Sequence, residues 1–254
     1  MQPNQRHSQV GIDRFIRLNW LEHTACLCLA GNEVPAVKVA LQEYLKGAFR
    51  CDATKVRNSL DKTITILMKI WVRPPGELRP LQREGLKLIS QLPCEEHIAV
   101  HWGQACAVYP FWGAIAAHVG RLLRLQRTVT AAQVQRRMQE QYGERDTVFR
   151  ATRRVLQSFV DWGVLKEPPE EKGVYTPGVS LTVNRIELIA WLAEAFLRTH
   201  QNSSVPLGTI LNSTSFFPFA LSSISADQLV AASRQLSILR NGLDQDFIML
   251  VKRL

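Results

Sequence analysis

Apolar residues recur every three or four positions through most of the first 110 residues, and this spacing predicts amphipathic helices. Gly31-Asn32 and Pro74-Pro75-Gly76 interrupt the pattern, and both are typical of turns. No segment of this part predicts a strand. Residues 1–109 are therefore expected to form a helical module, with helices over residues 12–30, 35–47, 55–72, 81–92 and 95–109.

Between residues 110 and 178 the pattern changes to one of helices and short strands. A first helix is predicted over 111–125 and a short strand over 128–130. Thr130 can cap a helix over 131–142, and Gly143 opens a tight turn to a second helix over 146–162, where Asp146 or Thr147 can act as the cap. Gly163 is suited to a left-handed residue after this helix. Two strands, 164–166 and 174–176, then flank the charged turn 167–173.

The helix over 146–162 separates apolar from basic side chains at 100° per residue. The side expected in the core carries Val148, Ala151, Thr152, Val155, Leu156, Phe159 and Trp162. The opposite side carries Thr147, Arg150, Arg153, Arg154 and Gln157.

This order of elements resembles the winged helix-turn-helix, a DNA-binding domain, over residues 110–178. The resemblance implies that the second helix of the motif enters the DNA major groove and that the hairpin, the wing, lies beside the backbone or minor groove. The wing departs from the family in one respect. Glu167, Glu170 and Glu171 would repel phosphate.

Residues 179–254 predict a helical C-terminal module. A helix is expected over 186–198, and a capping box of Ser225 and Gln228 begins a second one that runs to Arg240 and ends at Gly242. A strand is predicted over 247–251. The order also fits a degenerate second winged helix. Between the helices, Phe216, Phe217 and Phe219 either form a small satellite core or dock a partner.

Charge narrows the choice of partner. The 254 residues carry a formal charge of +9, with a pI near 9.6, and 46% of them are hydrophobic. Residues 119–166 alone hold ten cations, nine of them arginine, against four anions. Arginine can donate two parallel hydrogen bonds to a phosphate or a guanine, so a nucleic acid is the favoured partner. The alternative is a protein-interaction scaffold in which the arginines meet an acidic partner.

The chain shows no signal peptide and no apolar run long enough to span a bilayer, which predicts a cytoplasmic protein without a membrane partner. Five cysteines, an odd number, indicate reduced thiols. Phosphate-binding glycine loops, nucleophile elbows and H-E-x-x-H are absent from the sequence, so we expect a non-catalytic protein.

Two spacings suggest metal ligands. Cys94, His97, His101 and Cys106 read C-x2-H-x3-H-x4-C, but all four lie within thirteen residues, whereas structural zinc sites join distant segments. The sequence favours a helical core containing His101, Trp102, Cys106 and Tyr109, with His97 at its rim. His23-x2-Cys26-x-Cys28 is a weaker pattern. We therefore expect no metal and no cofactor.

The overall plan also resembles the BrxA accessory proteins of bacterial BREX phage-defence systems. The resemblance is to a helical N-terminal module containing KVRNSLDKTITILMKIW (55–71), joined to winged-helix units in a basic chain. It implies an antiviral role as the DNA-contacting subunit of a defence complex; transcription regulation is the other role considered.

The sequence thus predicts a mainly α, DNA-binding protein with double-stranded DNA as its partner, and with a protein partner or self-association besides. The residues expected to contact DNA are Arg124, Arg127, Arg136, Arg137, Arg145, Thr147, Arg150, Arg153, Arg154 and Gln157.

Overall fold

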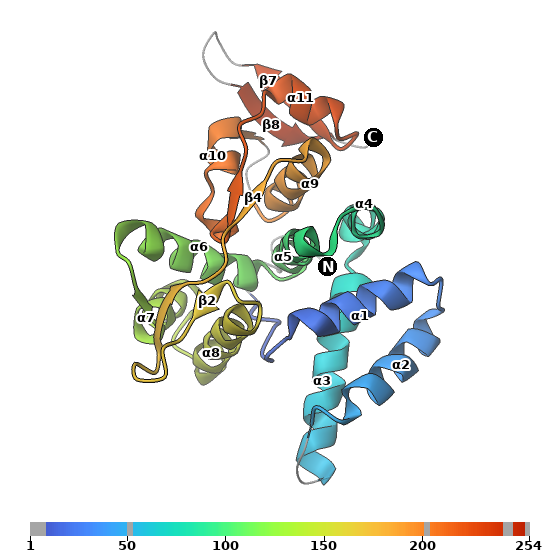
Figure 1. The fold of residues 1–254 in the computed structure, drawn as a ribbon, viewed down its shortest axis with the longest axis vertical. Coiled ribbons are helices and arrows are strands. Elements are labelled where there is room, and N and C mark those ends of the chain that lie inside the picture. The colour runs from blue at the N-terminus through green and yellow to red at the C-terminus, as the bar shows by residue number, and fades with distance from the viewer. Residues whose placement is uncertain (1–8, 50–52, 201–203, 241–245, 252–254) are drawn as a thin grey trace.

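The computed structural model describes residues 9–49, 53–200, 204–240 and 246–251, with the backbone alone at 53–58. Within these ranges the chain is mostly helical with three small sheets, which confirms the expected mainly α class (Figure 1). None of the helices in the described ranges is both long and apolar enough to cross a lipid bilayer. The described cysteines, Cys26, Cys28, Cys94 and Cys106, are all free thiols.

The N-terminal module is helical, as expected. Its most buried helix is α5, in which every residue after His97 is buried, and Figure 1 shows α5 where the three parts of the molecule meet. His101, Trp102, Cys106 and Tyr109 are buried there and His97 lies at the rim, which confirms the predicted packing. The elements are α1 (Leu18–Leu29), α2 (Val34–Lys46), α3 (Ala53–Trp71), η2 (Gly76–Leu78), α4 (Arg79–Gln91), η3 (Cys94–Glu96) and α5 (His97–Val108).

The first helix is shorter than its periodicity predicts. Residues 12–17 are not helical, although Ile12 and Ile16 are completely buried. The backbone N–H of Ile16 donates to Ser158 Oγ at 2.9 Å, across 142 positions of sequence. A distant partner thus satisfies a backbone group that a helix would otherwise have satisfied locally. In the tract 55–71, the side chains of 55–58 lie outside the described residues.

The central part contains α6 (Pro110–Leu125), β1 (Val129–Thr130), α7 (Ala131–Tyr142), α8 (Asp146–Asp161), β2 (Leu165–Lys166) and β3 (Val174–Pro177). Strand β3 pairs antiparallel with both β1 and β2, giving the order β1-β3-β2. Thr130 caps its helix, as predicted, and also forms a capping box with Gln133. Gly163 has φ of 72°, so the left-handed turn after α8 is also confirmed.

The C-terminal part is not the helical module that the sequence predicts. It contains β4 (Leu181–Val183), α9 (Ile186–Leu197), β5 (Ser204–Pro206), α10 (Leu207–Leu211), η4 (Thr214–Phe216), β6 (Phe219–Leu221), α11 (Ala226–Ala231), β7 (Leu236–Arg240) and β8 (Asp246–Leu250). The strands form a parallel pair β4-β6 and an antiparallel sheet in the order β5-β8-β7.

The expected helix over 225–240 is the clearest error within this part. Its capping box is present, but α11 ends at Ala231 and residues 236–240 form β7. Leu236 and Ile238 pair with residues of β8, and this long-range pairing overrides local helix propensity. The expected strand over 247–251 is confirmed as β8. The predicted helix end at Gly242 lies outside the described residues.

The aromatic cluster of the C-terminal part belongs to the core rather than to an exposed docking surface. Phe216 and Phe219 are buried and Phe217 is half-buried. The rings of Phe217 and Phe219 lie 5.3 and 5.8 Å from that of Trp102 in α5, measured between centroids. Buried residues from all three predicted ranges form one continuous cluster. The division into domains 1–109, 110–178 and 179–254 stays a prediction.

Candidate nucleic-acid interface

Helix α8 has the two faces that its sequence predicts. All seven residues assigned to its core face are buried. On the opposite face Thr147, Arg150, Arg153 and Arg154 are exposed, whereas Gln157 is half-buried. Gln157 Oε1 accepts a hydrogen bond from Arg154 at 3.1 Å, so it orients an arginine within the helix.

The start of α8 differs from the prediction. Arg145 occupies the N-cap position, and neither Asp146 nor Thr147 caps the helix through its side chain. Asp146 instead lies in the first turn, where a negative charge interacts favourably with the helix dipole. Its carboxylate forms an ion pair with Arg150, with an N–O distance of 2.5 Å.

The N-terminal segment covers the last turns of α8. Trp162, just after the helix, donates from Nε1 to the carbonyl of Ile16 at 3.0 Å, and the N–H of Leu18 donates to Asp161 Oδ2 at 3.2 Å. Together with the bond between Ile16 and Ser158, these contacts fix the segment along α8. The exposed part of the basic face is therefore its N-terminal half, residues 146–154.

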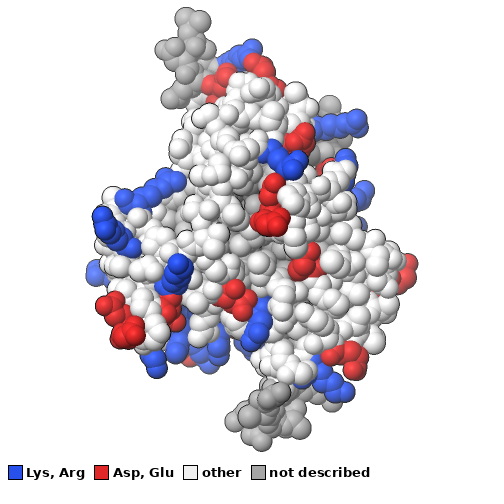
Figure 2. Space-filling model, in the orientation of Figure 1, with Lys and Arg blue, Asp and Glu red and all other residues white. Residues whose placement is uncertain are grey.

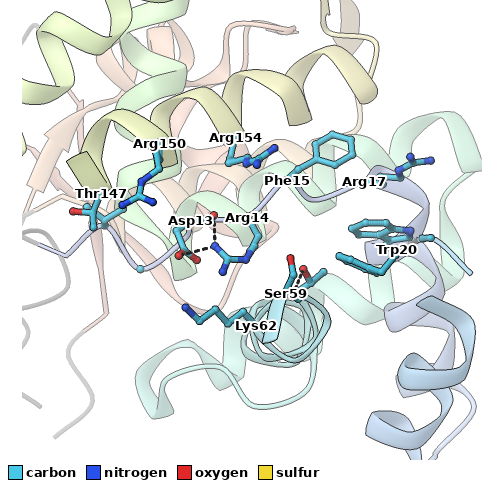
Figure 3. Close-up of a pocket in the computed structure, with 15 residues that line it drawn as sticks. Asp13, Arg14, Phe15, Arg17, Trp20, Ser59, Lys62, Thr147, Arg150 and Arg154 are labelled. Carbon is cyan, nitrogen blue, oxygen red and sulfur yellow. Dashed lines mark hydrogen bonds and ion pairs between the residues drawn. The ribbon is translucent and has the colours of Figure 1, made fainter. Parts of the chain in front are cut away.

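That half of α8 forms one wall of a cavity of about 840 Å³. Figure 3 shows Arg150 and Arg154 on α8 along one side of the cavity, with Lys62 on α3 across from them and Arg14 between. The cavity is lined by Val10, Gly11, Asp13, Arg14, Phe15, Arg17, Trp20, Ala48, Phe49, Ser59, Lys62, Thr63, Thr147, Arg150 and Arg154. Two parts that are remote in sequence thus share one basic groove.

The sequence interpretation missed Arg14, Arg17 and Lys62, because they lie outside residues 110–178, the range that resembles a winged helix-turn-helix. The available signal was the alternation of arginine with aromatic residues over 14–20. In the structure the Arg17 guanidinium lies 5.5 Å from the ring centroid of Phe15 and 5.6 Å from that of Trp20. Such stacking holds an arginine in place. Arg17 also forms a long ion pair, with its Nε 3.9 Å from Asp161 Oδ1.

Arg14 is oriented by its neighbour in the chain. Its Nη1 donates to both the carbonyl and the carboxylate of Asp13 at 2.8 Å. Its Nε is buried and has no hydrogen-bond partner among the described residues. Arg14 therefore retains an unused hydrogen-bond donor beside the groove. A buried donor without a partner is costly, so a ligand that accepts from it would remove this cost.

Several other predicted DNA-contacting residues interact within the protein. Arg124 donates to the carbonyl of Asn212 at 2.8 Å, and Arg145 donates to that of Tyr142 at 2.9 Å. Both side chains therefore hold backbone segments. Arg136 and Arg137 form ion pairs with Glu140 at 3.2 and 2.9 Å. Arg127 and Arg153 are exposed and form no ion pair within the described ranges.

The hairpin between β2 and β3 uses one of its acidic residues internally. The N–H of Gly173 donates to Glu167 Oε1 at 2.7 Å, which closes the turn. Glu170 and Glu171 are exposed. Figure 2 shows Lys and Arg gathered over the region of α6, α7 and α8, with acidic side chains among them. The basic surface is therefore centred on the helices and not on the hairpin.

No protein-family model, curated protein sequence or solved structure matches the chain.

Proposed function

We propose that the chain is a non-catalytic DNA-binding protein and that residues 110–178 act as a winged helix-turn-helix. The order α6-β1-α7-α8-β2-β3 supports this proposal, as does the sheet order β1-β3-β2. The turn between α7 and α8 begins at Gly143, whose φ is 90°. The observation that carries the function is the exposed, arginine-rich N-terminal half of α8 beside a basic groove.

In this proposal the first turns of α8 contact base edges in the major groove. Arg150 and Arg154 lie one helical turn apart, so both can reach the same groove, with Thr147 ahead of them. Lys62 lies across the cavity from α8, and Arg14 and Arg17 also line it, so the three suit the phosphates of the adjacent strand. Base contacts would then come from α8 and backbone contacts from the N-terminal module.

The ion pairs of the free protein do not oppose this role. The side chains of Arg150 and Asp146 are 67% and 72% exposed. Exposed pairs of this kind contribute only about 0–1 kcal/mol, so phosphate or guanine can replace the carboxylate. The pairs of Arg136 and Arg137 with Glu140 are similarly exposed.

One observation favours the alternative of a protein-interaction scaffold. Phe149 lies on α8 next to Arg150 and is 41% exposed. An exposed aromatic residue among arginines is a composition that protein interfaces prefer. On this alternative, α8 would dock an acidic protein surface, with Phe149 inserted into an apolar pocket of the partner.

The test measures binding of a labelled DNA duplex over a series of salt concentrations. Binding that involves several phosphates weakens steeply as salt rises. If the arginine donates two hydrogen bonds to a guanine, Arg150→Ala and Arg154→Ala should each lose about 1–3 kcal/mol of binding free energy for a preferred DNA sequence. Arg234→Ala serves as the control, because Arg234 is exposed but lies in the C-terminal part.

Two outcomes would count against DNA binding. One is an affinity for duplex that does not change with salt. The other is an unchanged affinity in the double variant of Arg150 and Arg154, with a normal circular dichroism spectrum. If Phe149→Ser keeps duplex binding, the aromatic is not needed for DNA. Loss of an acidic protein partner by the same variant would favour the scaffold.

A role as a regulator or as the DNA-contacting subunit of a bacterial defence complex is part of this proposal. The C-terminal part supports a further element of it. Apart from η4 and β6, which lie between α10 and α11, the order α9-β5-α10-α11-β7-β8 and the sheet order β5-β8-β7 repeat those of the central part. We therefore infer a degenerate second winged helix, whose weakly basic surface is suited to a protein partner or a second copy.

A further inference from the structure

A second cluster of reactive side chains lies outside the basic groove, where α1 meets the start of α5. Glu22 comes from α1, Cys94 from η3, and His97 begins α5. One potential ligand atom from each residue lies within 4.8 Å of the others. The three side chains line a cavity of about 420 Å³, together with His101 and five other residues. Solvent ions can therefore reach the cluster.

The hydrogen bonds of His97 place one ring nitrogen against Glu22, where either a proton or a metal ion can lie between them. His97 Nε2 lies 3.0 Å from the carbonyl oxygen of Leu92, which can only accept, so Nε2 carries a hydrogen. In the neutral ring Nδ1 then has a lone pair. It faces Glu22 Oε1 at 3.0 Å. Two acceptors at that distance need a proton or a metal ion between them.

His101 fixes the carboxylate from the buried side. Its Nδ1 accepts from the indole N–H of Trp71 at 3.1 Å, so its Nε2 carries the hydrogen and donates to Glu22 Oε2 at 2.7 Å. His101 thus orients Glu22 and leaves Oε1 turned toward His97, as outer-shell partners of metal ligands do.

The donor set selects the ion. A thiol sulfur, an imidazole nitrogen and a carboxylate oxygen are the ligand types that zinc prefers. Cys26 offers a fourth, because it lies one helical turn after Glu22 and its Sγ is 3.9 Å from Glu22 Oε1. The ligands then come as two pairs from distant segments, which is the usual arrangement of structural zinc sites.

We propose that Glu22, Cys26, Cys94 and His97 bind a zinc ion that ties α1 to the start of α5. A rotation of the exposed Cys26 side chain completes the set. The sequence pattern missed the site because it compared Cys94 and His97 only with residues nearby. His101 and Cys106, which shared that pattern, are buried and take other roles. This inference does not depend on DNA binding.

The test uses cobalt(II) as a spectroscopic probe. The full chain, purified under reducing conditions and stripped of metal by a chelator, should bind one equivalent of cobalt. Its spectrum should contain thiolate-to-cobalt charge transfer and the visible bands of a tetrahedral ion, and zinc should displace the cobalt. Loss of an outer-shell partner typically lowers metal affinity about 10–100-fold. Cys94→Ser and His97→Gln each remove a ligand, so each should lower the affinity for cobalt by at least this factor.

Two neighbouring residues provide matched controls. Cys28 donates its thiol to the carbonyl of Trp71, and the His23 ring stacks on Tyr44, so neither faces the cluster. Cys28→Ser and His23→Gln should leave cobalt binding unchanged. Thermal melting without metal shows whether each variant folds. Zinc should raise the melting temperature of the parent but not that of folded His97→Gln.

Three results would overturn the proposal. The first is a stoichiometry far below one in the parent protein. The second is a bound cobalt spectrum without thiolate charge transfer. The third is unchanged binding in a folded Cys94→Ser, His97→Gln double variant, which would place the metal elsewhere.

Discussion

The central and C-terminal parts of the molecule share an order of helices and strands but differ in the helix that would face a partner. In the central part this helix is α8, with 16 residues and an exposed basic face. In the C-terminal part it is α11, with 6 residues and no arginine. A shared frame therefore does not imply a shared ligand, because the frame depends on buried apolar positions and the ligand depends on exposed ones.

The cations of the two parts also have different surroundings. Arg153 forms no ion pair within the described ranges, and Arg150 has one exposed carboxylate partner. Arg240, at the end of β7, is bonded to Asp227 and to Asp246. Arg240 of the C-terminal part is thus paired with two carboxylates, whereas Arg150 has one such partner and Arg153 has none among the described residues. Four substitutions test this contrast, beginning with the largest expected effect.

Trp162→Ala should destabilise the protein by about 3–5 kcal/mol, the cost typical of deleting a buried tryptophan. Trp162 is 4% exposed, and its ring lies 5.1 Å from Trp112 and 5.9 Å from Trp102. Denaturant unfolding gives the difference in free energy. In the C-terminal part, Leu229→Ala removes a completely buried side chain and should shift the same transition. If the two substitutions shifted two different unfolding transitions, the two parts would not share one core.

Gly120→Ala tests the contact between the two parts. An added Cβ on α6 would overlap the carbonyl oxygen of Thr214 and lie 2.6 Å from Phe217 Cβ. We expect a net loss of about 1–3 kcal/mol from overpacking, although alanine itself favours a helix. Gly113→Ala in the same helix is the control, since its Cβ would meet Cys106 at an ordinary 3.7 Å. Equal thermal stability of the two variants would contradict the tight contact.

Lys62→Ala tests whether the N-terminal module contributes to DNA binding. If Lys62 contacts a phosphate, the variant should bind all DNA sequences more weakly. The slope of log affinity against log salt concentration should also become shallower by about one. Plots of affinity against salt concentration measure this slope. Lys38→Ala on α2 removes an exposed lysine outside the cavity and should leave the slope unchanged. An unaltered slope for Lys62→Ala would restrict binding to the central part.

Arg240→Ala should have the smallest effect. Its side chain is 61% exposed, and such surface pairs are worth about 0.2–1 kcal/mol. Stability should fall by no more than this in a denaturant titration, and DNA affinity should stay at the parent value. A loss of DNA affinity as large as that of Arg150→Ala would remove the functional difference between the two parts.

The sequence alone determined the features that depend on neighbouring residues. All seven residues that helical periodicity assigned to the core side are buried, because side chains repeat at a fixed angle along a helix. The buried Ser158 of α8 was not among them. The capping box at Thr130 and the left-handed Gly163 were also predictable, since each satisfies the backbone groups of one adjacent turn. These features place the exposed arginines of α8 without reference to the rest of the fold.

Tertiary structure decided whatever depends on a distant partner. Residues 12–17 lie along α8 instead of extending α1, and residues 236–240 pair with β8 instead of extending α11. Packing of helices also placed Lys62 across one cavity from Arg154, and Glu22 near Cys94 and His97. Periodicity cannot identify such neighbours, because hydrogen bonds and side-chain contacts between remote segments form only when the chain packs into one core.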